Sequence, residues 1–264
     1  IASNAFGTSS LATVTLSPVT ASTLSITYPY SNPITFFGKS VNIITPPVWI
    51  SADGITATFT GTGSLTNGTA QLSGATTAII VDYTTIGANA FENSALTSIT
   101  IPDSVTTIGG AALYNCTNLT SVTIGNSLTS ISDHCFNACA ALSAITIPTS
   151  VTSIGASAFY GCNALTSIII PDSVTSIGSS AFITCIGLTS ITFSGTPTIT
   201  SLSDNVFRYC AGVTSITIPD SVANIGSYTF ASCTGLTSIT IPDAVTSIGQ
   251  STFESCSSLT SITI

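Results

Sequence analysis

The sequence predicts a β-rich solenoid, built from coils of 23 residues that share a parallel sheet, with a small β-sandwich inserted near its N-terminal end. Three observations predict this fold. A short motif recurs with a nearly constant period, apolar residues alternate within each copy as they do in a strand, and one large apolar position recurs once per copy. A single coil of this length cannot bury its apolar side chains, whereas coils stacked at strand spacing can.

The repeated motif is clearest at residues 236–249, which read LTSITIPDAVTSIG. Successive copies begin 23 residues apart, except for one step of 25, at Leu96, Leu119, Leu142, Leu165, Leu188, Val213, Leu236 and Leu259. The longer copy contains Ser194-Gly-Thr-Pro-Thr198 where other copies have a Pro-Asp-Ser turn, so its extra residues fall in a turn. A constant period with an insertion confined to a turn is typical of a solenoid.

Each copy is expected to contain a strand, a turn and a second apolar wall. The strand at 165–170 should point alternate side chains inward, namely Leu165, Ile168 and Ile170. The pair Pro171-Asp172 ends this strand, because proline donates no ladder hydrogen bond and aspartate favours turns. Val174 and Ile177 then form the second wall, and Gly178 is expected to adopt backbone dihedrals that other residues avoid.

Two residue types recur once per coil and define the expected core. The aromatic column comprises Phe91, Leu113, Phe136, Phe159, Phe182, Phe207, Phe230 and Phe253. The thiol column comprises Cys116, Cys139, Cys162, Cys185, Cys210, Cys233 and Cys256, with Cys135 as an additional core residue. We expect reduced thiols packed as small apolar groups. Disulfides between adjacent coils are the alternative, because coil spacing falls within the range that a disulfide spans.

The repeats resemble the BspA-type leucine-rich repeat, whose pattern reads LTSITIPxSVTSIGxxAFxxC, over about residues 83–264. The resemblance implies a right-handed solenoid with a parallel sheet on one face, of the kind found on bacterial and protist surface proteins. It further implies an interaction protein, such as an adhesin, and not an enzyme. The solenoid domain is expected to span residues 79–264.

The first 78 residues divide into two further segments. Residues 1–16 align without gaps to residues 86–101, so they are interpreted as an N-terminal half-coil of the same solenoid. Residues 17–78 are expected to form short strands between turns, at Thr23–Tyr28, Val41–Ile44, Ile55–Thr60 and Thr76–Val81. This segment resembles the immunoglobulin-like domains of large bacterial surface proteins, which implies a small inserted β-sandwich.

The composition restricts the partners and the location of the protein. Only 5% of its residues are charged, and ten acids against two bases (Lys39 and Arg208) give a net charge of −8. This charge argues against nucleic acid and anionic membranes as partners. No apolar run approaches the roughly 20 residues of a membrane span, so membrane insertion is not expected. The scarcity of lysine and the abundance of serine and threonine favour an extracellular or cell-surface protein.

No group of residues predicts catalysis, a cofactor or a bound metal. The only histidine, His134, has no partners that would form a catalytic triad. A linear column of cysteines cannot converge on a zinc ion, which needs four ligands around one point. The aspartates that share one turn position are expected to cap turns and not to bind calcium; they are Asp103, Asp172, Asp220 and Asp243.

The outward strand positions form the one patterned surface. Hydroxyl residues occupy them coil after coil, and the candidate binding residues are Thr100, Thr123, Thr146, Thr192, Thr217 and Thr240. A solvated face of β-forming residues is the simplest interpretation. A face that packs on itself, binds glycans or matches ice are the alternatives, and the interruptions at Ala144 and Ile169 weaken the ice hypothesis.

Three functions are consistent with these patterns. The first is an extracellular structural protein that assembles head to tail into a filament or surface layer. Its expected self-association residues are Ile1, Phe6, Leu11, Val14, Leu259, Ile262 and Ile264. The second is an adhesin or receptor-binding module of the cell surface, the sequence then being an excerpt of a longer protein. Its partners would be proteins or glycans of host or neighbouring cells. The third is a glycan- or ice-binding solenoid.

Overall fold

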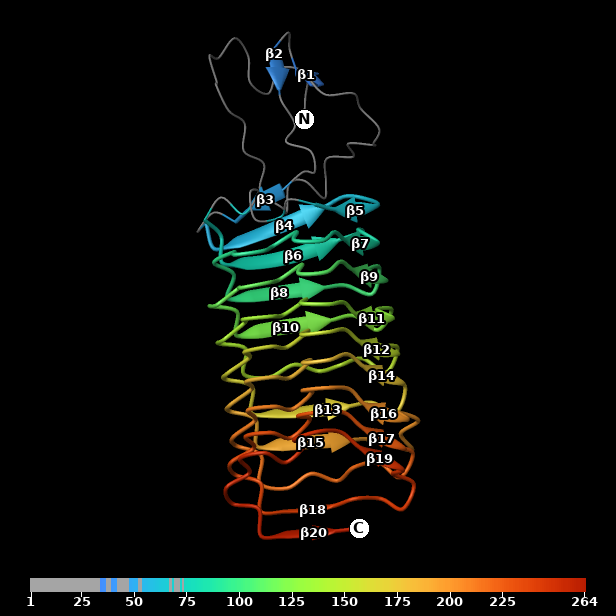
Figure 1. Cartoon of the computed structure of the whole chain (residues 1–264). Coiled ribbons are helices and arrows are strands. Elements are labelled where there is room, and N and C mark those ends of the chain that lie inside the picture. The colour runs from blue at the N-terminus through green and yellow to red at the C-terminus, as the bar shows by residue number, and fades with distance from the viewer. Residues whose placement is uncertain are drawn as a thin grey trace.

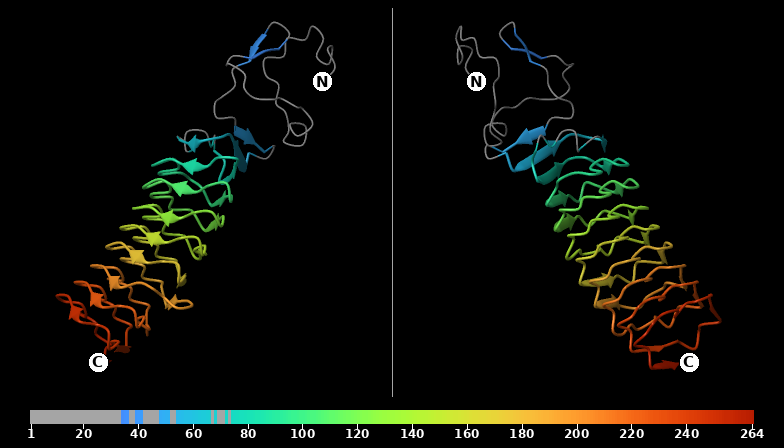
Figure 2. Two further views of the ribbon diagram at one scale, coloured as in Figure 1. Left: turned by 90° about the vertical axis from the view of Figure 1, so that its right-hand side faces the viewer. Right: turned by 60° about the vertical axis from the view of Figure 1, so that its left-hand side comes forward.

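The computed structural model describes residues 34–36, 39–41, 48–51, 54–66, 68, 72 and 74–264. The expected half-coil at residues 1–16 and the expected strand Thr23–Tyr28 lie outside this range. The described chain winds into an elongated β-solenoid of about nine turns, with the C-terminus at one end of the stack (Figures 1 and 2).

One wall of the solenoid consists of its longer strands, which follow one another along the stack (Figure 1). They are β4 (Thr56–Thr60), β6 (Thr77–Val81), β8 (Ser98–Ile101), β10 (Ser121–Ile124), β13 (Ser167–Ile170), β15 (Ser190–Phe193), β18 (Ser238–Thr240) and β20 (Ser261–Thr263). Neighbouring strands pair in parallel and in register, so that Ser167 lies opposite Ser190 and Ser238 opposite Ser261. The predicted parallel sheet is therefore confirmed.

The second wall consists of two-residue strands. They are β5 (Ser64–Leu65), β7 (Thr85–Ile86), β9 (Thr107–Ile108), β11 (Ser130–Ile131), β12 (Ser153–Ile154), β14 (Ser176–Ile177), β16 (Ser201–Leu202), β17 (Asn224–Ile225) and β19 (Ser247–Ile248). All of their pairings are parallel. Each except β19 buries one apolar side chain, and Ile154 and Ile177 are buried as expected; Ile248 of β19, near the end of the stack, is 44% exposed.

The first wall narrows to single bridges in two coils. Ser121 bridges Ala144, and Thr217 bridges Thr240, without a full strand around either Ala144 or Thr217. The inward side chains of these coils are still buried, as Ile145, Ile147, Ile216 and Ile218 show. Core packing therefore continues through both coils where backbone pairing weakens.

The N-terminal end of the described solenoid begins earlier than residue 79. Strands were expected at Ile55–Thr60 and Thr76–Val81 and are present as β4 and β6, but the two pair in parallel with each other, and β6 pairs with β8. They therefore belong to the solenoid wall and not to a separate sandwich. Their apolar side chains, such as Phe59 and Ile80, are buried in the same core as the repeats, which explains this placement.

Two shorter antiparallel pairs precede this coil. Strand β3 (Val48–Ile50) pairs antiparallel with β4, so the edge of the wall is covered by a strand of opposite direction. Strands β1 (Ile34–Phe36) and β2 (Lys39–Val41) pair antiparallel with each other, and β2 overlaps one end of the strand expected at Val41–Ile44. The inserted immunoglobulin-like domain stays a prediction.

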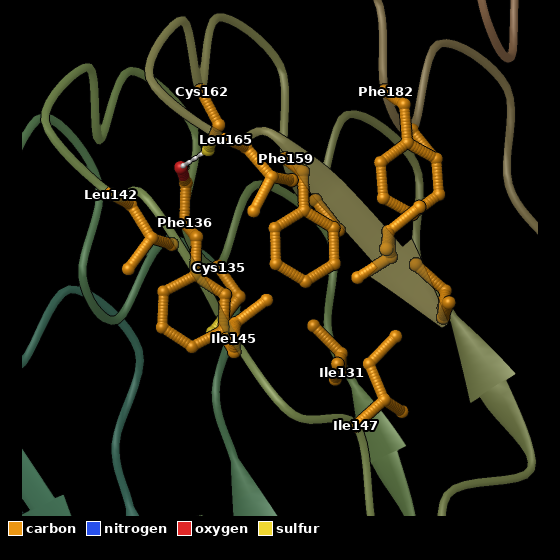
Figure 3. Packing of buried hydrophobic residues seen from close by; sticks show 14 of the residues in the cluster. Ile131, Cys135, Phe136, Leu142, Ile145, Ile147, Phe159, Cys162, Leu165 and Phe182 are labelled. Carbon is orange, nitrogen blue, oxygen red and sulfur yellow. Dashed lines mark hydrogen bonds between the residues drawn. The ribbon is translucent and has the colours of Figure 1, made fainter. Parts of the chain in front are cut away.

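Stacked phenylalanines fill the core of the repeats (Figure 3). Consecutive rings from Phe136 to Phe253 lie parallel with centroids 5.1–5.9 Å apart, and the rings of Phe159 and Phe182 are the closest pair. Leu113 takes the place of a ring one coil before Phe136, and Phe91 contacts Phe59 edge to face. The aromatic column predicted from the period is confirmed as core.

The third side of each coil carries unusual backbone conformations. Ser180 and Thr184, which flank Phe182 at two residues on either side, have φ values of 62° and 61°. Their amides donate hydrogen bonds of 2.9 Å to the carbonyls of Asp204 and Arg208 in the next coil. These bonds between coils offset the cost of a left-handed conformation, which is about 1–2 kcal/mol for a residue with a side chain.

Gly178 was expected to adopt unusual dihedral angles, and that prediction is wrong, although the position does require glycine. Its φ is not positive, but a Cβ atom there would lie 2.4 Å from the backbone nitrogen of Ala156 in the preceding coil. Gly155, one coil earlier, meets the backbone of Asp133 in the same way. The repeated glycine is therefore required by the close approach of two backbones and not by its dihedral angles.

Candidate functional site: the outward sheet face and the solenoid end

The candidate binding threonines all lie on one exposed surface. Thr100, Thr123, Thr146, Thr192, Thr217 and Thr240 point outward from the first wall and are exposed. The strand register aligns them, since Thr100 lies opposite Thr123, and Thr217 opposite Thr240. We call these threonines, with the serines two residues before them, the hydroxyl face. None of the residues that define this face is charged.

The hydroxyl groups of these six threonines differ from those of neighbouring threonines in their hydrogen bonds. Thr120 and Thr189, which precede the strands, donate hydrogen bonds of 3.0 Å to the carbonyls of Thr97 and Thr166 in the preceding coil. Within the described part of the chain, no hydroxyl of the six face threonines makes such a bond. The threonines before the strands therefore hold coils together, and those of the face keep their hydroxyls available to solvent.

Two side chains interrupt the hydroxyl face. Ile169, in strand β13, is aligned with Thr192 and is 60% exposed, and Ala144 occupies a serine position. Ile79, which is aligned with Thr100 and 37% exposed, borders the face on its N-terminal side. The face is thus mostly polar, with Ile169 as the apolar side chain within it.

The expected self-association residues fall into two groups. Ile1, Phe6, Leu11 and Val14 lie outside the described residues. In the last coil, Leu259 is half-buried, Ile262 is 44% exposed and Ile264 is 88% exposed, whereas their equivalents Leu236, Ile239 and Ile241 are buried one coil earlier. Strand β20 pairs with β18 along one edge. The C-terminal coil consequently presents apolar side chains beside a strand edge.

The eight cysteines are free thiols, and all except Cys256 are buried. Six of the seven column thiols donate a hydrogen bond to a phenylalanine carbonyl in the preceding coil, as Cys162 does to Phe136 at 3.3 Å (Figure 3). The remaining one, Cys139, donates to Leu113 in the same way. Each of these carbonyls also accepts a hydrogen bond from a backbone amide of its own coil, as Phe136 does from Cys139 at 3.2 Å. The thiol column therefore adds a second donor to each carbonyl and links consecutive coils.

Burial determines the acidity of most of these thiols. It raises the pKa of Cys185 and of Cys233 to about 12. The pKa of Cys135 is raised in the same direction, also by burial. Cys116 differs, because hydrogen bonds from Cys139 and then Ser94 lower its pKa despite its burial. Apart from Cys116, the thiols of this column are thus held protonated, and protonated thiols are poor nucleophiles and poor metal ligands.

The histidine and the turn aspartates do not come together in a common site. His134 is exposed and its Nδ1 atom lies 3.1 Å from Asn137 Nδ2, while Cys135 faces the core as expected. Asp103 Oδ1 accepts a hydrogen bond of 2.6 Å from the backbone amide of Asn126 in the next coil, so this carboxylate links two neighbouring turns. Among the described residues, no three His, Cys, Asp or Glu side chains gather as a metal site would require.

Sequence reasoning missed two features. The threonines that precede the strands link coils through their hydroxyls, and the only signal for this is that they recur once per coil. A cluster of Arg208, Tyr209 and Tyr228 forms on the third side of the coil, and no periodic pattern marks it.

The described residues contain no helix long and apolar enough to cross a membrane. The leucine-rich repeat solenoid is a non-catalytic repeat scaffold.

Comparison with known proteins identifies the repeats. Residues 84–210 and 200–264 match the model of the BspA type leucine rich repeat region, in six copies. No curated protein matches the chain. A leucine-rich repeat protein from Bacteroides ovatus is 30% identical over 69% of this chain, with a TM-score of 0.57, and the match covers 59% of that protein. The leucine-rich repeat protein of T. pallidum is 24% identical, with a TM-score of 0.54, over 81% of this chain and 87% of that one.

The period, the buried phenylalanine and thiol columns, and the parallel walls all agree with this match, which covers more than half of the chain. The protein belongs to the BspA-type leucine-rich repeat family.

Proposed function

We propose that the chain is a cell-surface recognition module that binds extended polysaccharides through its hydroxyl face. The observation that carries this proposal is the contrast between the two sets of threonines. The hydroxyls of Thr97, Thr120 and Thr189 are used between coils, whereas those of Thr100, Thr123 and Thr192 are exposed and make no bond within the described chain. Free hydroxyls in a regular row can exchange hydrogen bonds with the hydroxyls of a sugar chain.

The composition of the face favours a glycan over a protein partner. Protein interfaces are enriched in Tyr, Trp, Arg and Met at their centres, and their binding energy concentrates in such residues. The hydroxyl face has none of these among its defining residues; its exposed apolar side chains are Ile169 within the face and Ile79 at its border. A repeating row of weak contacts fits a repeating ligand, because many weak sites on one scaffold raise the total affinity.

Binding to immobilised neutral polysaccharides, namely cellulose, xylan and mannan, tests this proposal. The triple variant Thr100→Val, Thr123→Val, Thr146→Val keeps the shape of the face but removes three hydroxyls. It should weaken binding by about tenfold or more, since each hydrogen bond contributes about 0.5–1.5 kcal/mol. The matched control is Thr97→Val, Thr120→Val, Thr189→Val, which removes hydroxyls that are bonded between coils and should leave binding unchanged. Equal binding by both triple variants, or no binding by the native chain, would show the proposal to be wrong.

A second function, head-to-tail assembly into a filament or surface layer, is favoured by the exposed apolar side chains of the last coil. A second copy stacked there would bury Ile262 and Ile264, and burying such a side chain contributes about 1.5–3 kcal/mol. A contact that joins unlike ends does not close, so it generates a filament. Sedimentation velocity over a range of concentrations tests this assembly.

The assembly hypothesis predicts that Ile262→Asp combined with Ile264→Asp gives monomers, as should removal of residues 1–16. Ile169→Asp, an equally apolar but lateral position, is the control and should still assemble. A chain lengthened at its C-terminus by further copies of the repeat tests whether this end is an assembly surface. If the lengthened chain is monomeric, the added coils cover the apolar end and the hypothesis is wrong.

A further inference from the structure

The third side of the coil carries a cationic cluster that the hydroxyl face does not include. The guanidinium carbon of Arg208 lies 4.8 Å from the ring centroid of Tyr209 and 5.0 Å from that of Tyr228, which belongs to the next coil. Nη1 donates a hydrogen bond of 3.2 Å to Asn205 Oδ1, and Nη2 donates one of 3.1 Å to the Tyr209 hydroxyl. The guanidinium is therefore fixed in position before any ligand arrives.

Within the described part of the chain, this guanidinium has no carboxylate partner, although charged groups usually form an ion pair when they are partly buried. Within the described residues, Arg208 forms no ion pair, and its buried Nε atom has no hydrogen-bond partner. Two of its five N–H groups are accounted for by Asn205 and Tyr209, which leaves one N–H on each Nη atom. A carboxylate is the anion whose geometry fits two such donors side by side.

Exposed aromatic side chains lie on the same side of the solenoid as Arg208. Tyr209 is 41% exposed, and Tyr160, which occupies the column of Arg208 two coils earlier, is 42% exposed. Interstrand spacing places the backbone of Tyr160 about 10 Å from that of Arg208. Ile183 lies between them in this column, because Gly161 and Thr184 bond to the carbonyls of Ile183 and Arg208 in succession.

We propose that Arg208, Tyr209 and Tyr228 form a binding site for the carboxylate of an acidic sugar residue, with the exposed Tyr209 ring lying against the C–H face of the sugar. The net charge of −8 selects this ligand class over an acidic peptide. A segment with several carboxylates is repelled by the chain as a whole, whereas one carboxylate on an otherwise neutral body meets the single guanidinium. The site deepens the proposed role in glycan recognition and rests on it.

Titration calorimetry of the intact chain with a trisaccharide that carries a single galacturonic acid residue tests the site, with its methyl ester as the neutral control. The acidic trimer should bind at least tenfold more tightly than the ester. Arg208→Gln should remove this difference, because hydrogen bonds to a charged group account for about tenfold or more in affinity. Arg208→Lys should restore only part of it, since lysine keeps the charge and loses the planar fork.

Glu254→Gln is the matched control, because Glu254 occupies the same column two coils after Arg208. Removing this carboxylate should leave binding of the acidic trimer unchanged or slightly stronger. Thermal unfolding of each variant shows that the fold is kept. Equal affinity for acid and ester, or full affinity in Arg208→Gln, overturns the site. Tighter binding of a peptide with a single aspartate overturns the sugar as its ligand.

The two experiments separate this site from the hydroxyl face. The triple variant of Thr100, Thr123 and Thr146 retains Arg208, so it should bind the acidic trimer as the native chain does. Loss of neutral polysaccharide binding without loss of the trimer therefore assigns the two activities to different sides of the solenoid.

Discussion

The Sγ atom of Cys185 donates a hydrogen bond of 3.1 Å to the carbonyl oxygen of Phe159, whose ring stacks on that of Phe182 at 5.1 Å. The two columns thus support each other, because the thiol of one coil satisfies the backbone of the residue that supplies the ring of the coil before it. The Phe159 carbonyl also accepts a hydrogen bond from the Cys162 amide at 3.2 Å, so the thiol is its second donor. A hydrogen bond contributes about 0.5–1.5 kcal/mol, so the repeated thiol contributes more than its apolar volume.

Breaking the ring stack should weaken the solenoid. Phe182→Ala removes a fully buried ring that contacts two others, and it should lower the free energy of unfolding by about 3–5 kcal/mol. Phe182→Leu should cost less, since Leu113 already occupies this column. Urea titrations followed by circular dichroism measure both. A loss below about 1 kcal/mol in the alanine variant would contradict the buried stack.

The buried thiols should make the protein less stable in alkali. Burial raises the pKa of Cys185 and Cys233 to about 12, against about 8.5 in an unfolded chain. The folded state therefore holds protons that the unfolded state releases. Their contribution is complete below about pH 8.5 and is lost progressively as the pH rises toward 12, by up to about 1.4 kcal/mol per pH unit and thiol.

Urea midpoints at several pH values between 8 and 11 check this alkaline effect. Cys185→Ala should show a shallower decline than the native chain, because it lacks one of the titrating groups. An identical decline in both proteins would mean that this thiol does not titrate differently on unfolding.

Alkylation should distinguish one thiol from the rest. Cys256 is the only partly exposed cysteine, whereas the other seven are buried. Iodoacetamide at pH 8 under native conditions should modify Cys256 first, as peptide mass spectrometry can show. After denaturation all eight should react, because none is bridged. Thiols that stay unreactive until a reductant is added would instead indicate disulfides between coils.

Two glycines should respond differently to the same substitution. At Gly178 a Cβ atom would lie 2.4 Å from the Ala156 nitrogen, and backbone cannot move aside as a flexible side chain can. Gly178→Ala should therefore cost several times more than Gly161→Ala, which should cost about 1 kcal/mol because Gly161 has a φ of 70° and an added Cβ atom would make only an ordinary contact of 3.8 Å with Ala138. Ala138 adopts this conformation at the equivalent position one coil earlier. Thermal unfolding of the two variants makes the comparison, and equal losses would be inconsistent with the close approach.

Much of the repeat region could be predicted from the sequence because each coil repeats its neighbour. The inward positions Leu165, Ile168 and Ile170 are buried as the alternation indicated, and the thiols face the core. The sequence did not indicate that the segment at 55–81 belongs to the solenoid wall, because its strands lack the Pro-Asp-Ser turn and the spacing of the motif. Only the pairing of β4 with β6 shows that this segment joins the wall.

The sequence by itself determined the period, the identity of the core columns and the outward position of the threonines, because a strand alternates its side chains regardless of what lies beside it. The tertiary structure alone decided which hydroxyls are free. Thr120 and Thr123 are three residues apart and chemically identical, but only the first has a carbonyl of the preceding coil within reach. It also decided that Arg208 lies between two tyrosines from different coils, since such a contact depends on how coils stack and leaves no periodic trace in the chain.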